Sequence, residues 1–355
     1  MVSSTLSWLT QASKSLSQQH LQLAQKRQAL LTKPAGSLGA FELLAIRLAA
    51  MQATQRPSAD NVSINIFAAD HGIAAEGVSA FPQAVTAEMI KNFARGGAAI
   101  CVAAKQNSAN LHVWNLGTVA PVDCGAVVKN RIIAPQTANF AQSPAMSSDQ
   151  LNSAMLVGVE AAESACFPEG LFIGGEMGIA NTSAATAIAA VLLGCNVSDL
   201  VGPGTGLNAD GVKHKASVID IALKRHNLSG SDALQVLKSL GGFEIAALVA
   251  GYIRCAQLGI PVIVDGFICT VAALVAYRIN PSVLDWFIFS HQSAEPGYQL
   301  LIKAFPNQVP LLDLGMRLGE GSGAAACIPL IRLACAWHND MATFGEAAVS
   351  EQSEY

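Results

Sequence analysis

Apolar residues in this chain form short runs that are separated by longer stretches with helical periodicity. Six short, nearly all-apolar runs are typical of buried strands and lie at 62–69, 111–116, 171–173, 199–201, 262–264 and 286–289. Helical segments are predicted between them, for example at 86–105, 182–193 and 243–258. Apolar strands with helices on both faces predict an α/β fold built on a doubly wound, mostly parallel sheet.

Glycine and polar residues follow most of these strands at their carboxyl ends. Asp70-His71-Gly72 follows the first strand, and Ser290-His291 follows the last. Ligands of doubly wound sheets bind beyond the carboxyl ends of the strands. The pattern therefore predicts a single active site at this edge of the sheet.

The N-terminal segment carries a separate apolar pattern. Four leucines recur every seven residues: Leu9, Leu16, Leu23 and Leu30. The spacing predicts one long amphipathic helix over about 5–31, followed by a second helix over about 41–55. The leucine stripe must be buried, either against the same chain or against a second subunit.

Composition narrows the class of protein. With 355 residues, 52% of them hydrophobic and 13% charged, the chain can bury a large core. A net charge of -4 gives no electrostatic footprint for nucleic acid or an acidic membrane surface. No secretion signal is expected in residues 1–19, and Asp265 interrupts the longest candidate membrane span. Eight cysteines without a CxxC pair indicate reduced core residues, so we expect a soluble cytoplasmic protein.

Two glycine-rich loops are candidates for phosphate binding. The segment 174–182 follows a predicted strand and opens a helix, a geometry that can hold an anion at a helix N-terminus. A plain tight turn capped by Asn181 or Thr182 remains an alternative. The segment 202–206 is a second such loop, and Lys213 and Lys215 follow it. Two such loops near lysines would suit a phosphorylated sugar.

Glu320 lies in a glycine-rich turn that opens the apolar segment 324–336. Flanking glycines let a substrate approach closely, and the helix start supplies backbone N–H groups. Glu320 is therefore a candidate proton acceptor, and a solvated glutamate in a flexible loop is the alternative.

Six polar residues can be considered as ligands of a metal ion: Asp70, His71, Asp210, His214, Asp265 and His291. They lack the local spacing of dedicated metal sites, so we expect no metal and interpret most of them as hydrogen-bonded residues at strand ends. The chain has no GxSxG motif and no evident Cys–His pair, which argues against an acyl-transfer nucleophile.

Seven motifs together resemble one known family, with a match from about residue 33 to 335. They lie at 33–39, 67–79, 82–86, 175–179, 204–206, 290–297 and around Glu320. The chain resembles the nicotinate-nucleotide–dimethylbenzimidazole phosphoribosyltransferases of cobalamin synthesis. The resemblance implies transfer of the phosphoribosyl group of nicotinate mononucleotide to 5,6-dimethylbenzimidazole, which gives α-ribazole 5′-phosphate and nicotinate. It implies no cofactor.

The resemblance also implies an architecture and a set of site residues. It implies a Rossmann-like catalytic domain at 59–321, a smaller helical domain from 1–58 and 322–355, and a homodimer. Glu320 is the implied catalytic base. The implied substrate-binding residues are Ser79, Phe81, Gln83, Gly175, Glu176, Gly178, Asn181, Thr182, Gly202, Gly204, Thr205, Gly206, Lys215, Asp265, Ser290, His291 and Leu318.

Some positions depart from the family pattern. Ala180 stands where glycine is usual, Pro203 where arginine is common, and Tyr298 where histidine often occurs. Two other functions remain open at this point, a nicotinamide-dinucleotide-dependent dehydrogenase and a non-catalytic nucleotide sensor. The missing GxGxxG motif after the first strand counts against the dehydrogenase, and a glutamate in an open glycine turn would be wasted in a sensor.

Overall fold

The computed structural model describes residues 4–165, 169–228, 230 and 232–350. Within these residues, six parallel strands form one sheet in the order β3-β2-β1-β4-β5-β6. The strands are β1 (Val62–Ala69), β2 (Asn110–Gly117), β3 (Val128–Asn130), β4 (Leu171–Met177), β5 (Val262–Val264) and β6 (Phe287–Phe289). The strand order reverses between β1 and β4, which is where doubly wound sheets bind ligands. The predicted α/β, doubly wound, parallel sheet is confirmed.

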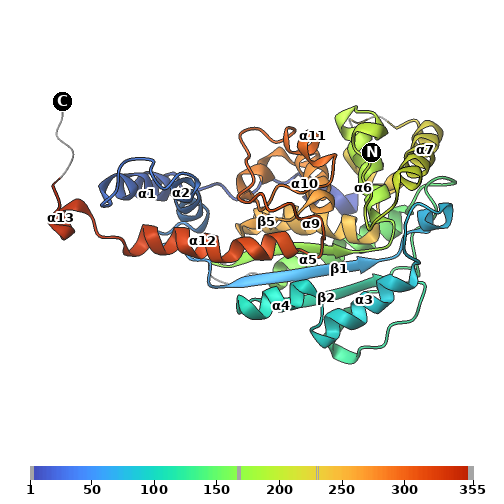
Figure 1. Ribbon diagram of the computed structural model, residues 1–355, viewed down its shortest axis with the longest axis horizontal. Coiled ribbons are helices and arrows are strands. Elements are labelled where there is room, and N and C mark those ends of the chain that lie inside the picture. Colours follow the sequence, from blue (N-terminus) through green and yellow to red (C-terminus); the bar gives the residue numbers. More distant parts are fainter. Residues whose placement is uncertain (1–3, 166–168, 229, 231, 351–355) are drawn as a thin grey trace.

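Helices cover both faces of this sheet (Figure 1). Those in the body are α3 (Ala84–Arg95), α4 (Ala99–Gln106), α5 (Ser148–Ser164), α6 (Asn181–Leu193), α7 (Ala209–His226), α8 (Ala233–Leu240), α9 (Phe243–Leu258), α10 (Phe267–Ile279) and α11 (Tyr298–Ile302). Helix α9 packs along α5 and contacts β1, β4 and β5. The predicted helices at 182–193 and 243–258 correspond to α6 and α9.

Two adjacent glycines in β4 let the chain pack tightly on both faces of the sheet. A Cβ atom on Gly174 would collide with Leu248 and Tyr252 of α9. A Cβ atom on Gly175 would lie 2.5 Å from the carbonyl oxygen of Glu320, on the opposite face. Successive residues of a strand point to opposite faces. The glycine pair therefore admits α9 on one side and the Glu320 turn on the other.

A group of helices from the two ends of the chain extends beyond the sheet at the left of Figure 1. It contains α1 (Gln18–Leu30), α2 (Ala40–Gln52), α12 (Ser322–Asp340) and α13 (Phe344–Ala347). Arg27 of α1 donates hydrogen bonds to the carbonyls of His338, Asn339 and Met341 at the end of α12. The cationic side chain of Arg27 stabilises the C-terminus of α12. Its hydrogen bonds also join the two ends of the chain.

Helix α12 contains a proline, Pro329, in its interior. Proline lacks an N–H group, so the carbonyl of Ala325 loses its usual partner in the helix. The side chain of Asn107, which follows α4, donates a hydrogen bond of 3.3 Å to that carbonyl. The proline is therefore accommodated by a side chain from a neighbouring element.

The predicted single helix over 5–31 is wrong. The chain forms a short 3-10 helix, η1 (Ser4–Thr10), and then α1, with an irregular segment between them. Ser17 caps α1 by accepting a hydrogen bond from the backbone N–H of His20. Leu9 is 1% exposed and Leu30 is 53% exposed, so the seven-residue spacing does not mark one buried stripe.

The division into domains at 1–58 with 322–355 and at 59–321 stays a prediction. The first segment lies against the larger unit, because η1 contacts α9 and the N–H of Lys14 donates to the carbonyl of Ala256.

Three other expectations need correction. Residues 199–201 are not a strand. Asp199 ends the 3-10 turn η4 (Val197–Asp199), and the backbone N–H groups of Leu200 and Val201 donate to the carbonyl of Val197 instead of to a neighbouring strand. The edge strand β3 was not predicted, because Val128–Asn130 has little apolar pattern. The predicted helix over 86–105 is two helices, since α3 ends at Gly96 with φ of 80°.

No disulfide joins cysteines within the described part of the chain, and Cys166 lies outside it. In that same part, no helix combines the length and the apolar character that a membrane crossing needs.

Candidate active site

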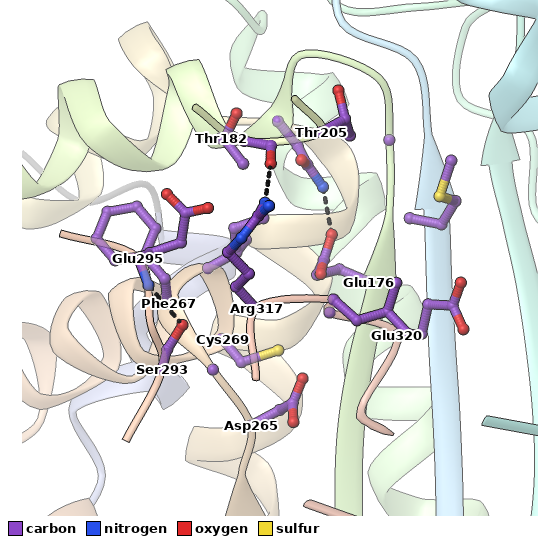
Figure 2. A pocket seen from close by; sticks show the side chains of 18 of the residues that line it. Glu176, Thr182, Thr205, Asp265, Phe267, Cys269, Ser293, Glu295, Arg317 and Glu320 are labelled. Atoms are coloured by element: carbon purple, nitrogen blue, oxygen red, sulfur yellow. Dashed lines mark hydrogen bonds between the residues drawn. The ribbon is translucent and has the colours of Figure 1, made fainter. Parts of the chain in front are cut away.

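A cavity of about 450 Å³ lies beyond the carboxyl ends of β4 and β5 (Figure 2). Loops after both strands, the start of α6 and the Glu320 turn surround it. The predicted site residues that line it are Phe81, Glu176, Gly178, Asn181, Thr182, Gly204, Thr205, Asp265, His291, Leu318 and Glu320. The structure thus brings predicted residues from six separate segments of the chain into one enclosure.

Glu320 occupies an unusual backbone conformation in the cavity wall. Gly319, Glu320 and Gly321 have φ values of 89°, 63° and 79°, and such left-handed geometry is uncommon for a residue with a side chain. Glu320 is 7% exposed, and among the described residues its Oε2 atom has no hydrogen-bond partner. Burial raises the pKa of its carboxyl, while the backbone N–H of Ile100 opposes this rise. A buried carboxylate with an unused oxygen is well suited to accept a proton.

Glu176 is a second buried carboxyl group in the same cavity, at the end of β4. The side-chain amide of Asn181 donates a short hydrogen bond to its Oε2 atom. Burial raises the pKa of Glu176 to about 8, and the nearby Glu244 adds to the rise. Glu176 is therefore mainly protonated at neutral pH, so it is a poorer proton acceptor than an ionised carboxylate.

Arg317 and the N-terminus of α6 lie at another side of the cavity, and Lys215 lies behind this side, in contact with Thr182. Lys215 of α7 is 1% exposed and donates a 2.7 Å hydrogen bond to the hydroxyl of Thr182. Arg317 donates a 2.8 Å hydrogen bond to the carbonyl of Gly204, and Figure 2 shows it extended in the cavity wall. The N-terminus of α6 also lies at the cavity, since Asn181 and Thr182 are its first residues. This side can bind an anion.

The N-terminus of α6 shows which residue caps this helix. The N-cap is Ala180, with φ of 75° and no side-chain cap hydrogen bond. Capping by Asn181 or Thr182 is therefore wrong. The loop is also shorter than expected, because Gly175 and Glu176 belong to β4 and pair with Ile66 and Phe67 of β1.

A third side of the cavity is apolar. Phe81, Val85 and Met89 line it from the segment that leads into and along α3, and Met177 and Ile179 line it from the end of β4. Phe81 and Leu318 are 49% and 60% exposed, which places exposed apolar surface on two residues of the lining. An aromatic ring system could bind here.

Seven predicted residues do not line the cavity: Ser79, Gln83, Gly175, Gly202, Gly206, Lys215 and Ser290. Most of them support residues that do. Lys215 contacts Thr182, the Ser79 hydroxyl accepts from the N–H of Phe81, and Gly202 leaves room for Glu295. Gln83 donates to the carbonyl of His71, and the Ser290 hydroxyl donates to that of Val264.

Several lining residues were not predicted: Val85, Met89, Met177, Ile179, Gly266, Phe267, Ile268, Cys269, Ser293, Glu295, Arg317 and Gly319. Several of them lie inside the motifs given above, so the sequence contained a signal for them: Val85, Met177, Ile179, Ser293, Glu295, Arg317 and Gly319. Glu295 is 7% exposed, and burial raises the pKa of its carboxyl while Lys215 and Arg317 oppose the rise.

Polar residues considered for a metal site have other arrangements. His71 and Glu244 are fully buried and lie 2.6 Å apart between Nε2 and Oε1. Asp210 and His214 are exposed on α7 and do not line the cavity, whereas Asp265 and His291 do. In the described ranges, no three His, Cys, Asp or Glu side chains form a group that could hold a metal ion.

The three departures from the family pattern avoid the cavity surface. Ala180 and Pro203 flank lining residues, and Tyr298 is fully buried at the start of α11. Ala180 adopts the left-handed conformation that glycine would adopt more easily.

Comparisons with known proteins agree on one family. A family model described as Phosphoribosyltransferase matches residues 13–349. The nicotinate-nucleotide–dimethylbenzimidazole phosphoribosyltransferase of Pseudomonas putida strain F1 is 55% identical over 350 residues, covering 98% of this chain and 99% of the relative. The enzyme of the same name from Pseudomonas fluorescens strain SBW25 is 54% identical, covering 98% and 99%. The crystal structure of CobT from Thermus thermophilus superimposes with a TM-score of 0.89 at 40% identity, covering 94% of this chain and 100% of that one.

Proposed function

The chain belongs to the nicotinate-nucleotide–dimethylbenzimidazole phosphoribosyltransferase family, and from this premise we propose how its cavity performs the reaction. The enzyme transfers the phosphoribosyl group of nicotinate mononucleotide to 5,6-dimethylbenzimidazole and releases nicotinate. The dehydrogenase and sensor alternatives have no support among these relatives, whose names denote a transferase.

The cavity has a separate side for each part of the two substrates. The phosphate binds at the start of α6, beside Lys215 and Arg317, because these groups supply positive charge and N–H donors. The benzimidazole lies on the apolar side formed by Phe81, Met177 and neighbouring residues. The ribose then bridges the two sides, with its C1′ atom near Glu320.

Glu320 is the proposed base, and its buried, unpartnered Oε2 atom is the observation that carries the proposal. Nicotinate leaves from a pyridinium, so its departure needs no proton. The attacking benzimidazole nitrogen makes the ring cationic unless its other nitrogen loses a proton. A carboxylate that accepts this proton stabilises the developing charge. Attack opposite the leaving group inverts the configuration at C1′, which gives the α-linked product.

Glu176 has a different role in this scheme. Because it is mainly protonated at neutral pH, its carboxyl group can donate a hydrogen bond to a substrate oxygen. Asn181 fixes its orientation from α6. The remaining acceleration comes from holding two reactants in line, which is worth up to roughly 7–11 kcal/mol in favourable cases.

The proposed enzyme is a cytoplasmic homodimer. Reduced cysteines are typical of the cytoplasm, and no disulfide joins cysteines among the residues described. Exposed leucines on the end helices support the dimer: Leu30 of α1, Leu43 of α2 and Leu333 of α12 are 53%, 66% and 37% exposed. These helices contact one another, so their exposed apolar side chains offer a surface for a second copy.

The test is to mix purified protein with nicotinate mononucleotide and 5,6-dimethylbenzimidazole and to separate the products by chromatography. Nicotinate and α-ribazole 5′-phosphate should appear in equal amounts, and nicotinate should not form when the benzimidazole is omitted. Nicotinate release without the second substrate would instead indicate a hydrolase. Absence of both products would reject the proposed reaction.

A further inference from the structure

Asp265 lies directly after β5, in the wall of the cavity, and is 1% exposed. Its two carboxylate oxygens are both engaged by the backbone of the Glu320 turn. Oδ2 accepts a 3.1 Å hydrogen bond from the N–H of Gly321, and Oδ1 accepts a 2.9 Å hydrogen bond from the N–H of Ala324. These contacts bracket the start of α12, which begins two residues beyond Glu320. Figure 2 labels both Asp265 and Glu320 in the cavity wall.

The turn that Asp265 contacts needs an external support. Three consecutive residues, 319 to 321, have positive φ, and the central one is a glutamate. Such a conformation persists in a non-glycine residue only when its surroundings fix it. Two other contacts pack against the turn without hydrogen bonds. Gly175 lies against the carbonyl of Glu320, and the ring of His291 lies so close to Gly323 that a Cβ atom there would not fit.

We propose that Asp265 is a positioning residue, which holds the carboxylate of Glu320 in its reactive place by anchoring the N–H groups of Gly321 and Ala324. This inference rests on the proposed function, in which Glu320 is the base. It replaces the sequence-based prediction that Asp265 binds substrate.

A carboxylate suits this task better than an amide. Asparagine has a single side-chain acceptor oxygen, whereas the two N–H groups here meet different oxygens. The opposing NH₂ group of asparagine would face one of these N–H donors. A negative charge at the N-terminus of α12 is also favoured by the helix dipole. Asp265→Asn therefore preserves the size of the side chain and removes half of the anchor.

The experiment compares Asp265→Asn with wild type in steady-state kinetics. We expect kcat to fall about tenfold to a hundredfold, as a misplacement of about 1 Å can cause, while the KM for nicotinate mononucleotide changes less than about threefold. Asp232→Asn is the matched control, because Asp232 accepts the N–H of Gln235 at the exposed start of α8. It should leave kcat unchanged. A raised KM with normal kcat in Asp265→Asn would show that Asp265 contacts substrate and would overturn the inference.

A double mutant tests whether Asp265 acts through Glu320. In a Glu320→Gln background, Asp265→Asn should lower kcat by less than about twofold, because the group that it positions has already lost its function. Losses that multiply in the double mutant would overturn the inference.

Amide hydrogen exchange tests the anchor without relying on activity. In the wild-type protein, the N–H groups of Gly321 and Ala324 should be protected, and Asp265→Asn should increase their exchange at least about tenfold. Exchange of these amides in wild type at the rate of an exposed loop would overturn the inference even if the variant failed to fold. If Glu320→Gln turned over normally, the proposed base would be wrong, and the exchange data would still report on the anchor.

Discussion

The ammonium group of Lys215 lies 2.7 Å from the hydroxyl of Thr182, and this contact joins α7 to the first turn of α6. Burial lowers the pKa of Lys215 to about 8, although Glu295 opposes the shift. Lys215 is therefore charged below pH 8 in the free enzyme and loses its proton as the pH rises through that value. A phosphate binds the charged form, so binding above pH 8 must also take up a proton.

This relationship predicts how substrate binding depends on pH. The KM for nicotinate mononucleotide should stay nearly constant from about pH 6.5 to 7.5 and should rise towards tenfold per pH unit well above 8. Lys215→Met should raise this KM at least about tenfold at pH 7 and abolish the rise above pH 8. Lys213→Met, which alters an exposed lysine on the same helix, should have neither effect. A flat pH profile in wild type would remove Lys215 from phosphate binding.

The loop at 202–206 provides a direct test of charge near the phosphate. Thr205 is exposed and lines the cavity, so Thr205→Asp should place a carboxylate near the bound phosphate and raise the KM at least about tenfold. Thr205→Asn is the neutral control and should change the KM less than about threefold. A substitution of Gly178 cannot serve this test, because the added Cβ atom would collide with the carbonyl of Ala69 and disturb the loop itself. Equal KM values for the two Thr205 variants would exclude this loop from phosphate binding.

Glu320→Gln should remove the base while both substrates still bind. Turnover should fall about 10²–10⁴-fold, as is typical of a lost general base. Glu176→Gln is the matched comparison at a second buried glutamate. Its effect at pH 6.5 should be much smaller, because glutamine resembles the protonated carboxyl group that the raised pKa maintains. Steady-state kinetics would measure the turnover of both variants. A larger loss of turnover in Glu176→Gln than in Glu320→Gln would identify Glu176 as the base.

Substitutions of the two adjacent glycines of β4 should have similar effects on stability but different effects on activity. Gly174→Ala and Gly175→Ala both introduce a methyl group into tight packing and should each cost about 1–3 kcal/mol of unfolding free energy. Gly175→Ala also presses on the carbonyl of Glu320, so it alone should lower kcat at least about tenfold. Urea denaturation and kinetics on the same samples would measure both quantities. An unchanged kcat in Gly175→Ala would mean that the Glu320 turn tolerates displacement.

Exposed leucines on the end helices predict the oligomeric state. Sedimentation should give a species of twice the 36.8 kDa chain mass at micromolar concentrations. Leu43→Glu should shift it towards the monomer, whereas Leu156→Glu, at a similarly exposed leucine of α5, should not. A single species at the chain mass in the wild-type protein would reject the homodimer.

Much of the fold could be predicted because the central strands are buried and mostly apolar. Strand β1 and helices such as α9 have long, mainly apolar patterns, so the sequence predicts them well. The N-terminal helix could not be predicted correctly, since four leucines at equal spacing suggest a continuous stripe although Ser17 starts a new helix. Short elements such as β3 are stabilised by pairing with β2, which a local pattern does not show.

The candidate site was predictable where polar residues lie in the glycine-rich segments 174–182 and 319–323. Glu320, Glu176 and Thr182 all line the cavity as expected. The carboxylate of Glu295 could not be assigned, because its place beside Lys215 depends on contacts between distant segments. The hydrogen bonds of Asp265 to Gly321 and Ala324 also could not be predicted, since they form only once α12 is positioned.

The support that Asn107 gives to α12 has a mechanical consequence. A helix with an interior proline bends more easily at that point than a continuous one. Glu320 lies before Pro329, and the contacts between α12 and Arg27 lie after it. We therefore expect movements of the end helices to be absorbed at the proline, with the bond from Asn107 to Ala325 keeping the first half of α12 in place. Association of two copies through the end helices could then proceed without disturbing the alignment of the base.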